Sequence, residues 1–141
     1  MDFVLPMAIM ALLKIFLTFR LILLASKFIL TKKIKLSQFR LYEGEFPDVL
    51  RSARYQFQNM FEIPMLLYPL CLAHIILGNY NQFDLYFVWG FVLFRIFHFF
   101  IRLQNQRNLN IRSRTATFLI SLIFLLAGWI KLLYNSIAYI S

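Results

Sequence analysis

The sequence contains one cysteine, Cys71, which lies in an apolar run, so an intramolecular disulfide and a cluster of thiolate metal ligands are both excluded. Charged residues are also scarce: they make up 15% of the 141 residues, and only six of them are acidic. Hydrophobic residues make up 61% of the chain, and the aromatic residues among them make up 18% of the chain. This is more apolar surface than one small soluble core could bury. The chain is therefore predicted to be a one-domain integral membrane protein, residues 1–141.

The few charged residues are mostly basic, and they give a formal net charge of +9. A nucleic-acid-binding protein would carry such an excess on a solvent-exposed face, whereas these residues lie between the apolar runs or at their ends. Nucleic acid is therefore not an expected partner. The anionic headgroups of membrane lipids are the expected general partner.

Four apolar segments, at about 3–30, 55–78, 85–104 and 115–140, are each long enough for the ~20 residues that cross a bilayer. Pro64 and Pro69 in the second segment remove backbone hydrogen bonds and should bend it, which membrane helices tolerate. The sequence thus predicts an all-α fold, an integral membrane four-helix bundle.

Basic residues gather in two of the three connections between these segments. They are Lys32, Lys33, Lys35, Arg40, Arg51, Arg54, Arg102, Arg107, Arg112 and Arg114. The turn at 78–84 has none. Because basic loops stay in the cytoplasm, both termini are predicted to lie outside it.

Glu62 is the only acidic residue inside any of the predicted apolar segments. An ionisable side chain in hydrocarbon is costly unless it is paired or faces a polar cavity, so it marks a functional site by default. Other polar residues share its helix face, or lie beside it, at spacings of three and four. They are Arg51, Arg54, Tyr55, Gln58 and Asn59.

On the third segment, Arg95, His98 and Arg102 also follow helical spacing. Glu62 and Arg95 should both lie roughly 10 Å deep, given ~1.5 Å rise per residue, and they are predicted to meet as an ion pair. Arg20, deep in the first segment, is a further candidate for this polar pocket.

Structural interpretations of the same residues stay open. A buried pair of Glu62 and Arg95 can serve only to fix the helix register. His98 can be an interhelical hydrogen-bonding residue. Arg107 and Arg114 are favoured as topology determinants that contact lipid phosphate.

Three short motifs resemble the MAPEG family, the membrane-associated proteins of eicosanoid and glutathione metabolism. They are Asn59-x-x-Glu62 followed by Pro64, then Arg95-x-x-His98, then Ile111-Arg112-Ser113. The resemblance covers roughly residues 51–130 and is nearest to a bacterial branch, which implies the bacterial inner membrane. It also implies a homotrimer with glutathione held between neighbouring subunits by residues like Asn59, Glu62, Arg95, His98 and Arg112.

Glutathione suits these residue types. Arginines match its carboxylates, Glu62 matches its ammonium, and nearby positive charge favours its thiolate. The resemblance assigns Ser113, directly after Arg112, as the hydroxyl that holds the thiolate. Many enzymes of the family have a tyrosine at the position of Arg102, which here could stabilise a thiolate by charge alone.

Two functions follow from the resemblance. One is a glutathione-dependent transferase or peroxidase that acts on lipophilic electrophiles arriving from the bilayer. The other is a non-catalytic lipid-binding or scaffold protein. The polar residues around Glu62 favour the enzyme, and the missing tyrosine favours the second role.

Overall fold

The computed structural model describes residues 2–39, 45–78, 80–104 and 111–140, and in these residues all regular structure is helical. The helices are α1 (Val4–Leu30), the short 3₁₀ helix η1 (Leu36–Phe39), α2 (Asp48–Glu62), η2 (Pro64–Leu66), α3 (Leu67–Leu77), α4 (Gln82–Gln104) and α5 (Ile111–Ile140). Four stretches are long and apolar enough to cross a membrane: Val4–Leu30, Asp48–Leu77, Gln82–Gln104 and Ile111–Ile137. The predicted all-α, four-helix architecture is confirmed.

Three spans begin earlier than the apolar runs indicated. The second span starts at Asp48 rather than near 55, the third at Gln82 rather than near 85, and the fourth at Ile111 rather than near 115. Hydropathy detects only the apolar part of a span. Backbone hydrogen bonding, by contrast, continues through a polar first turn.

Pro64 interrupts the second span as predicted. The chain changes there from α2 to the 3₁₀ turn η2 and then resumes as α3. Pro69 lies in the first turn of α3, where its missing N–H removes a donor that has no intrahelical partner. The change of helix type at Pro64 lies two residues after Glu62, the last residue of α2.

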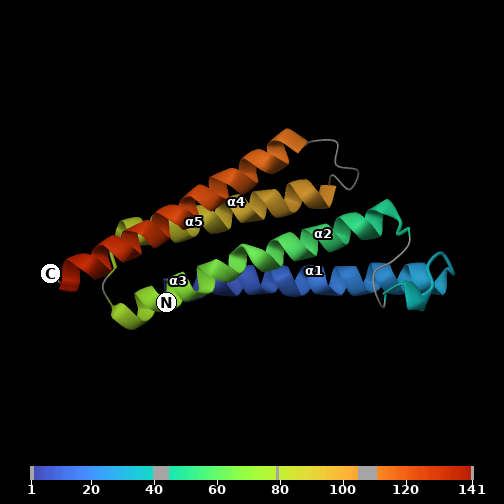
Figure 1. Cartoon of the computed structure of the whole chain (residues 1–141), viewed down its shortest axis with the longest axis horizontal. Helices are drawn as coiled ribbons and strands as arrows, with labels where there is room; N and C mark the ends of the chain where they lie inside the picture. The colour runs from blue at the N-terminus through green and yellow to red at the C-terminus, as the bar shows by residue number, and fades with distance from the viewer. Residues whose placement is uncertain (1, 40–44, 79, 105–110, 141) are drawn as a thin grey trace.

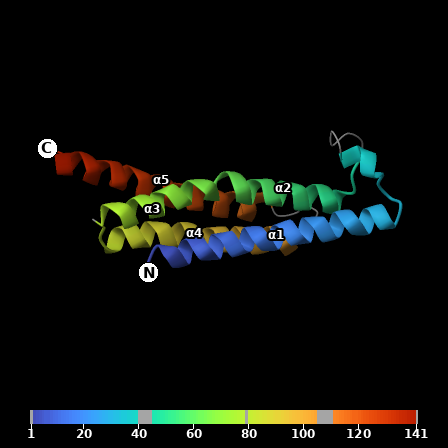
Figure 2. The same cartoon turned by 90° about the horizontal axis from the view of Figure 1, so that it is seen from below.

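Figures 1 and 2 together show how the four spans are arranged. In Figure 1, α1 runs beside α2 and α3, and α4 runs beside α5. In Figure 2, α1 lies with α4 on one side, and α3 lies with α5 on the other. We call the end of the bundle that carries Leu30, Asp48, Gln104 and Ile111 the basic end, and the end that carries both chain termini the opposite end.

Helices α4 and α5 approach each other closely at Gly90. A Cβ atom placed there would lie 2.5 Å from Cδ1 of Phe124, so only glycine fits. The Phe124 ring is held in place because it stacks on Phe94 with 5.7 Å between ring centroids. This contact fixes how α5 sits on α4, and so it also fixes the wall that these helices give to the candidate site.

A charged cluster at the opposite end was not predicted. Helix α4 begins at Gln82, so Asp84 lies inside a span, where it is 1% exposed. Lys131 Nζ lies 3.1 Å from Asp84 Oδ1 and also contacts Asn81 Oδ1. Asp84 precedes the predicted apolar segment 85–104, so Glu62 stays the only acidic residue inside the predicted apolar segments, but it is not the only one within the helical spans, because the third helix starts before the apolar run does.

Candidate functional site

A cavity of about 560 Å³ opens between α2, α4 and α5. We call it the interhelical cavity. Its described lining residues are Tyr55, Gln58, Asn59, Glu62, Ile63, Arg102, Arg114 and Phe118. It therefore combines one carboxylate and two guanidinium groups with amide and phenol groups. Such a mixture can bind a ligand that carries charges of both signs.

Glu62 faces this cavity and not Arg95. Its side chain is exposed, and its Oε1 accepts a hydrogen bond of 2.9 Å from Gln58 Nε2. Among the described residues, the ion pairs are Arg51 with Asp48 and Lys131 with Asp84, so the predicted pair of Glu62 with Arg95 is wrong. Similar depth did not ensure contact, because rotation about the helix axis decides which side chain faces α4.

Asn59 takes the place predicted for Glu62. Arg95 Nη1 donates to Asn59 Oδ1 across 3.5 Å, a long hydrogen bond. Arg95 itself is 0% exposed and lies near the ring of Phe118, 4.9 Å from its guanidinium carbon. Since Asn59 and Phe118 both line the interhelical cavity, Arg95 lies directly behind its wall.

The guanidinium group of Arg95 is incompletely satisfied. Its Nε and Nη2 atoms are buried without a hydrogen-bond partner among the described residues. Cation-π contacts with Phe118 and Phe91 offset part of its desolvation. A buried charge in this state attracts an anion or an acceptor strongly if one can reach it.

His98 connects α4 to α5 behind the same wall. Its Nδ1 lies 3.0 Å from the carbonyl oxygen of Arg114 and 3.3 Å from Thr117 Oγ1. The ring is 2% exposed, and Nε2 has no hydrogen-bond partner among the described residues. These contacts match the interhelical hydrogen-bonding role left open by the sequence, and they hold the Arg114 backbone at the cavity.

Arg102 and Arg114 place positive charge on the side of the cavity contributed by α4 and α5. Arg102 is only 8% exposed and occupies the position at which many family enzymes have tyrosine. Glu62 supplies negative charge from α2. The cavity therefore has opposite charge on its two sides.

The other predicted site residues lie elsewhere in the single chain. Arg20 Nη1 donates to Gln56 Oε1 at 2.8 Å, and Gln56 Nε2 donates to the carbonyl oxygen of Phe99. Arg20 therefore belongs to a hydrogen-bond network that connects α1, α2 and α4.

Arg51 and Arg54 line a different cavity. Arg112 and Ser113 are exposed in the first turn of α5 and are not among the lining residues of the interhelical cavity.

Sequence reasoning missed the contribution of Arg114. It was interpreted as a topology determinant, but its side chain lines the cavity. Gln58 was noted beside Glu62 but not assigned to the site, although the spacing of four residues on one helix predicts their contact. Arg107, the other arginine interpreted in this way, lies outside the described residues.

Comparison with known protein families gives a match that spans most of the chain. The model of the MAPEG family matches residues 3–134. The chain belongs to the MAPEG family. The match includes parts of all four candidate spans, and together they identify a membrane protein. Comparisons with curated proteins and with solved structures gave no match.

MAPEG family members include glutathione transferases and peroxidase-like proteins, and many use glutathione. The family match also extends the resemblance, because it includes α1 and most of α5 in addition to the three motifs. The interhelical cavity contains residues of the first of these motifs, Asn59 and Glu62. Arg95 and His98 of the second motif lie behind its wall.

Proposed function

We propose that this MAPEG protein binds glutathione in the interhelical cavity. It either joins glutathione, through its thiol sulfur, to lipophilic electrophiles from the bilayer or uses the thiol to reduce them. The observation that carries the proposal is the charge arrangement of the cavity, with Glu62 on one side and Arg102 and Arg114 on the other. Glutathione has an ammonium group and two carboxylates, so both sides have a partner.

The charged groups in and behind the interhelical cavity match the charged groups of glutathione in chemical type. Glu62 can accept from the ammonium, and Arg102 and Arg114 can donate to carboxylate oxygens. Arg95, buried behind Asn59 with two unpartnered nitrogen atoms, adds positive charge at the wall. Positive charge near a thiol favours the thiolate, which is the nucleophile in conjugation and in peroxide reduction.

Thermal stabilisation tests this proposal. The detergent-purified protein should melt at a higher temperature with millimolar reduced glutathione, because a ligand that binds only the folded state stabilises it. Oxidised glutathione and an unrelated tripeptide should have smaller effects. A melting temperature that does not respond to glutathione would contradict the proposal.

A specific observation favours the alternative, a non-catalytic lipid-binding or scaffold protein of the same family. The position of the family tyrosine holds Arg102, which cannot donate a phenolic proton. Turnover separates the two roles. The proposed enzyme should conjugate glutathione to a lipophilic aryl halide in proteoliposomes, whereas a scaffold protein would bind without turnover.

We further propose that the protein is a homotrimer. In the single chain Glu62 is exposed on the bundle, and Arg112 and Ser113 are exposed and are not among the residues that line the interhelical cavity. A neighbouring subunit would cover Glu62 from lipid and could bring Arg20 or Arg112 to the site. Native mass spectrometry in mild detergent should therefore give a trimer, and only monomers or dimers would contradict this assembly.

The proposed orientation puts the basic end in the cytoplasm and both termini outside, as in a bacterial inner membrane. Gln82 is exposed at the opposite end, and the single native cysteine, Cys71, is buried. A Gln82→Cys variant in intact cells should therefore react with a membrane-impermeant maleimide. Ser37→Cys at the basic end is the matched control and should react only after the cells are opened. The reverse pattern would show that the orientation is inverted.

A further inference from the structure

A second, separate cavity lies between α1 and α2 at the basic end. Its volume is about 220 Å³. The residues that line it are Leu21, Ile22, Ala25, Phe39, Phe46, Leu50, Arg51 and Arg54. We propose that this cavity, here called the α1–α2 cavity, holds part of one acyl chain of an anionic phospholipid whose phosphate is bound by Arg51 and Arg54.

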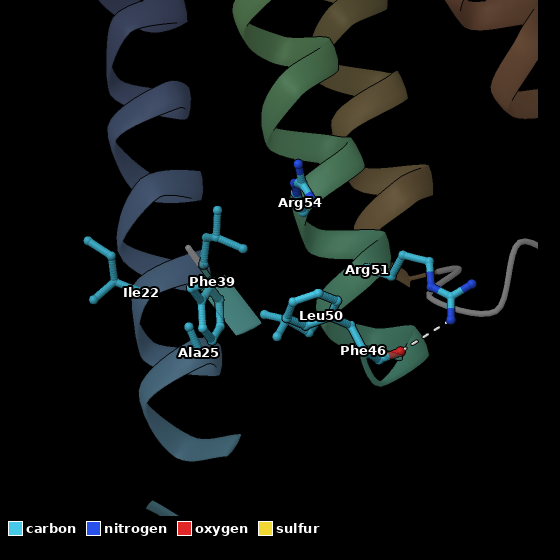
Figure 3. Close-up of a pocket in the computed structure, with 8 residues that line it drawn as sticks. Ile22, Ala25, Phe39, Phe46, Leu50, Arg51 and Arg54 are labelled. Atoms are coloured by element: carbon cyan, nitrogen blue, oxygen red, sulfur yellow. Dashed lines mark hydrogen bonds between the residues drawn. The ribbon is translucent and has the colours of Figure 1, made fainter. Parts of the chain in front are cut away.

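The interior of the α1–α2 cavity is apolar. Figure 3 shows Leu50 pointing from α2 toward Phe39, with Ile22 and Ala25 on the neighbouring α1 helix. Phe39 and Phe46 meet edge to face with 5.4 Å between ring centroids, and they close the side formed by the connection between the helices. An alkyl chain can fill such a space without leaving a polar group unsatisfied.

The size of the cavity suits a segment of one acyl chain and not a whole diacyl lipid. A volume of about 220 Å³ is below the ~300 Å³ at which pockets for drug-sized molecules begin, and it holds roughly seven groups the size of a water molecule or a methylene. The lipid's second chain has a place outside the cavity. Ile22 is 54% exposed and its neighbour Leu23 is 70% exposed, so this face of α1 is open to the bilayer.

The described residues that line the cavity include two arginines and no acidic residue. The planar fork of an arginine matches phosphate oxygens bidentately. In Figure 3 the guanidinium of Arg51 points away from α1, so it has to turn toward the cavity to bind a phosphate there. Arg51 donates to the Phe46 carbonyl oxygen at 3.2 Å and forms an ion pair with Asp48 at 3.6 Å. The side chains of both residues in this ion pair are exposed. An exposed pair of this kind contributes little free energy, so a phosphate can share or replace it.

The depth of the two arginines fits a lipid headgroup. Arg51 and Arg54 lie within the first two turns of α2, roughly 5–9 Å along the helix from Asp48 at ~1.5 Å rise per residue. Basic residues at this level of a membrane helix are the ones that bind anionic headgroups. The apolar residues from α1 lie beside them, so a chain can enter the cavity while its phosphate stays at the interface.

Photolabelling of the full-length wild-type protein tests the site. The protein is reconstituted in vesicles that contain phosphatidylglycerol with a diazirine near the middle of one acyl chain, and labelled peptides are mapped by mass spectrometry. Labelling should concentrate on residues 21–25 and 46–54, and phosphatidylcholine with the same diazirine should give severalfold less there. Uniform labelling of all four spans, or equal labelling by both lipids, would overturn the proposal.

Two pairs of variants test the cavity and its charge separately. Ala25→Phe fills the cavity and should abolish the concentrated labelling, whereas Ser26→Phe, exposed on the next position of α1, should leave it unchanged. Arg54→Gln should lower phosphatidylglycerol retention about tenfold or more, as expected for a lost charged hydrogen bond. Lys27→Gln, exposed in the last turn of α1, is the matched loss of charge and should have little effect.

Competition identifies the ligand. Unlabelled phosphatidylglycerol should displace the probe, and palmitate at the same membrane fraction should not, because a single-chain carboxylate lacks the phosphate and the second chain. Displacement by palmitate alone would reassign the cavity to a fatty acid and overturn the phospholipid proposal. If Ala25→Phe does not fold, the peptide map of the wild type together with the Arg54→Gln and Lys27→Gln pair still decides the question.

Discussion

Glu62→Gln should weaken glutathione binding by about ten- to a hundredfold and leave the melting temperature of the ligand-free protein nearly unchanged. The substitution removes a charge-assisted contact of roughly 1.5–3 kcal/mol with the ligand ammonium. It keeps the shape of the side chain and its ability to accept from Gln58. Because Glu62 does not contact Arg95, no buried guanidinium loses a counter-charge.

Two measurements on this variant are needed together: the melting temperature without ligand, and glutathione affinity by isothermal titration calorimetry. Glu45→Gln provides the matched control, because Glu45 is an exposed acid outside the interhelical cavity, and both quantities should match the wild type. An unchanged glutathione affinity combined with a large loss of stability would instead make Glu62 a structural residue. It would contradict the assignment of the interhelical cavity as the glutathione site.

Lys131→Met should destabilise the protein by about 3–5 kcal/mol, because it leaves the carboxylate of Asp84 buried without its counter-charge. The side chain of Asp84 is 0% exposed, and Lys131 Nζ lies 3.1 Å from it. Asp84→Asn should destabilise the protein less. It leaves Lys131 without a counter-charge, but the side chain of Lys131 is 21% exposed and lies near the ring of Phe83, so its ammonium can turn toward the interface.

The double variant Asp84→Asn with Lys131→Met should recover most of the lost stability, since a neutral pair leaves no buried charge. Free energies of unfolding from chemical denaturation in detergent would test this order. Lys33→Met, an exposed lysine at the basic end, should change little. Equal stabilities of Lys131→Met and the wild type would show that the pair does not form in the bilayer. Glutathione affinity should not change in any of these variants, because neither Asp84 nor Lys131 lines the interhelical cavity.

The candidate site was only partly predictable. Asn59 and Glu62 lie on the cavity as their helical spacing indicated, and so do Tyr55 and Arg102. Arg51 and Arg54 share that spacing but line the α1–α2 cavity, because α2 has neighbours on two sides and its polar residues are divided between them. The contribution of Arg114 depends on how α5 packs on α4, which close contacts such as Gly90 with Phe124 determine.

The sequence by itself determined that the protein is helical and has four candidate membrane spans, because a run of about twenty apolar residues can satisfy its backbone within a bilayer only as a helix or a closed barrel. It also located the polar residues of α2 and α4 along those helices. Only the tertiary structure decided which of them meet. Rotation about each helix axis put Asn59 rather than Glu62 against Arg95, and the packing of α5 on α4 brought Lys131 to Asp84. Such contacts depend on how separate helices pack, and the pattern within one helix does not contain that information.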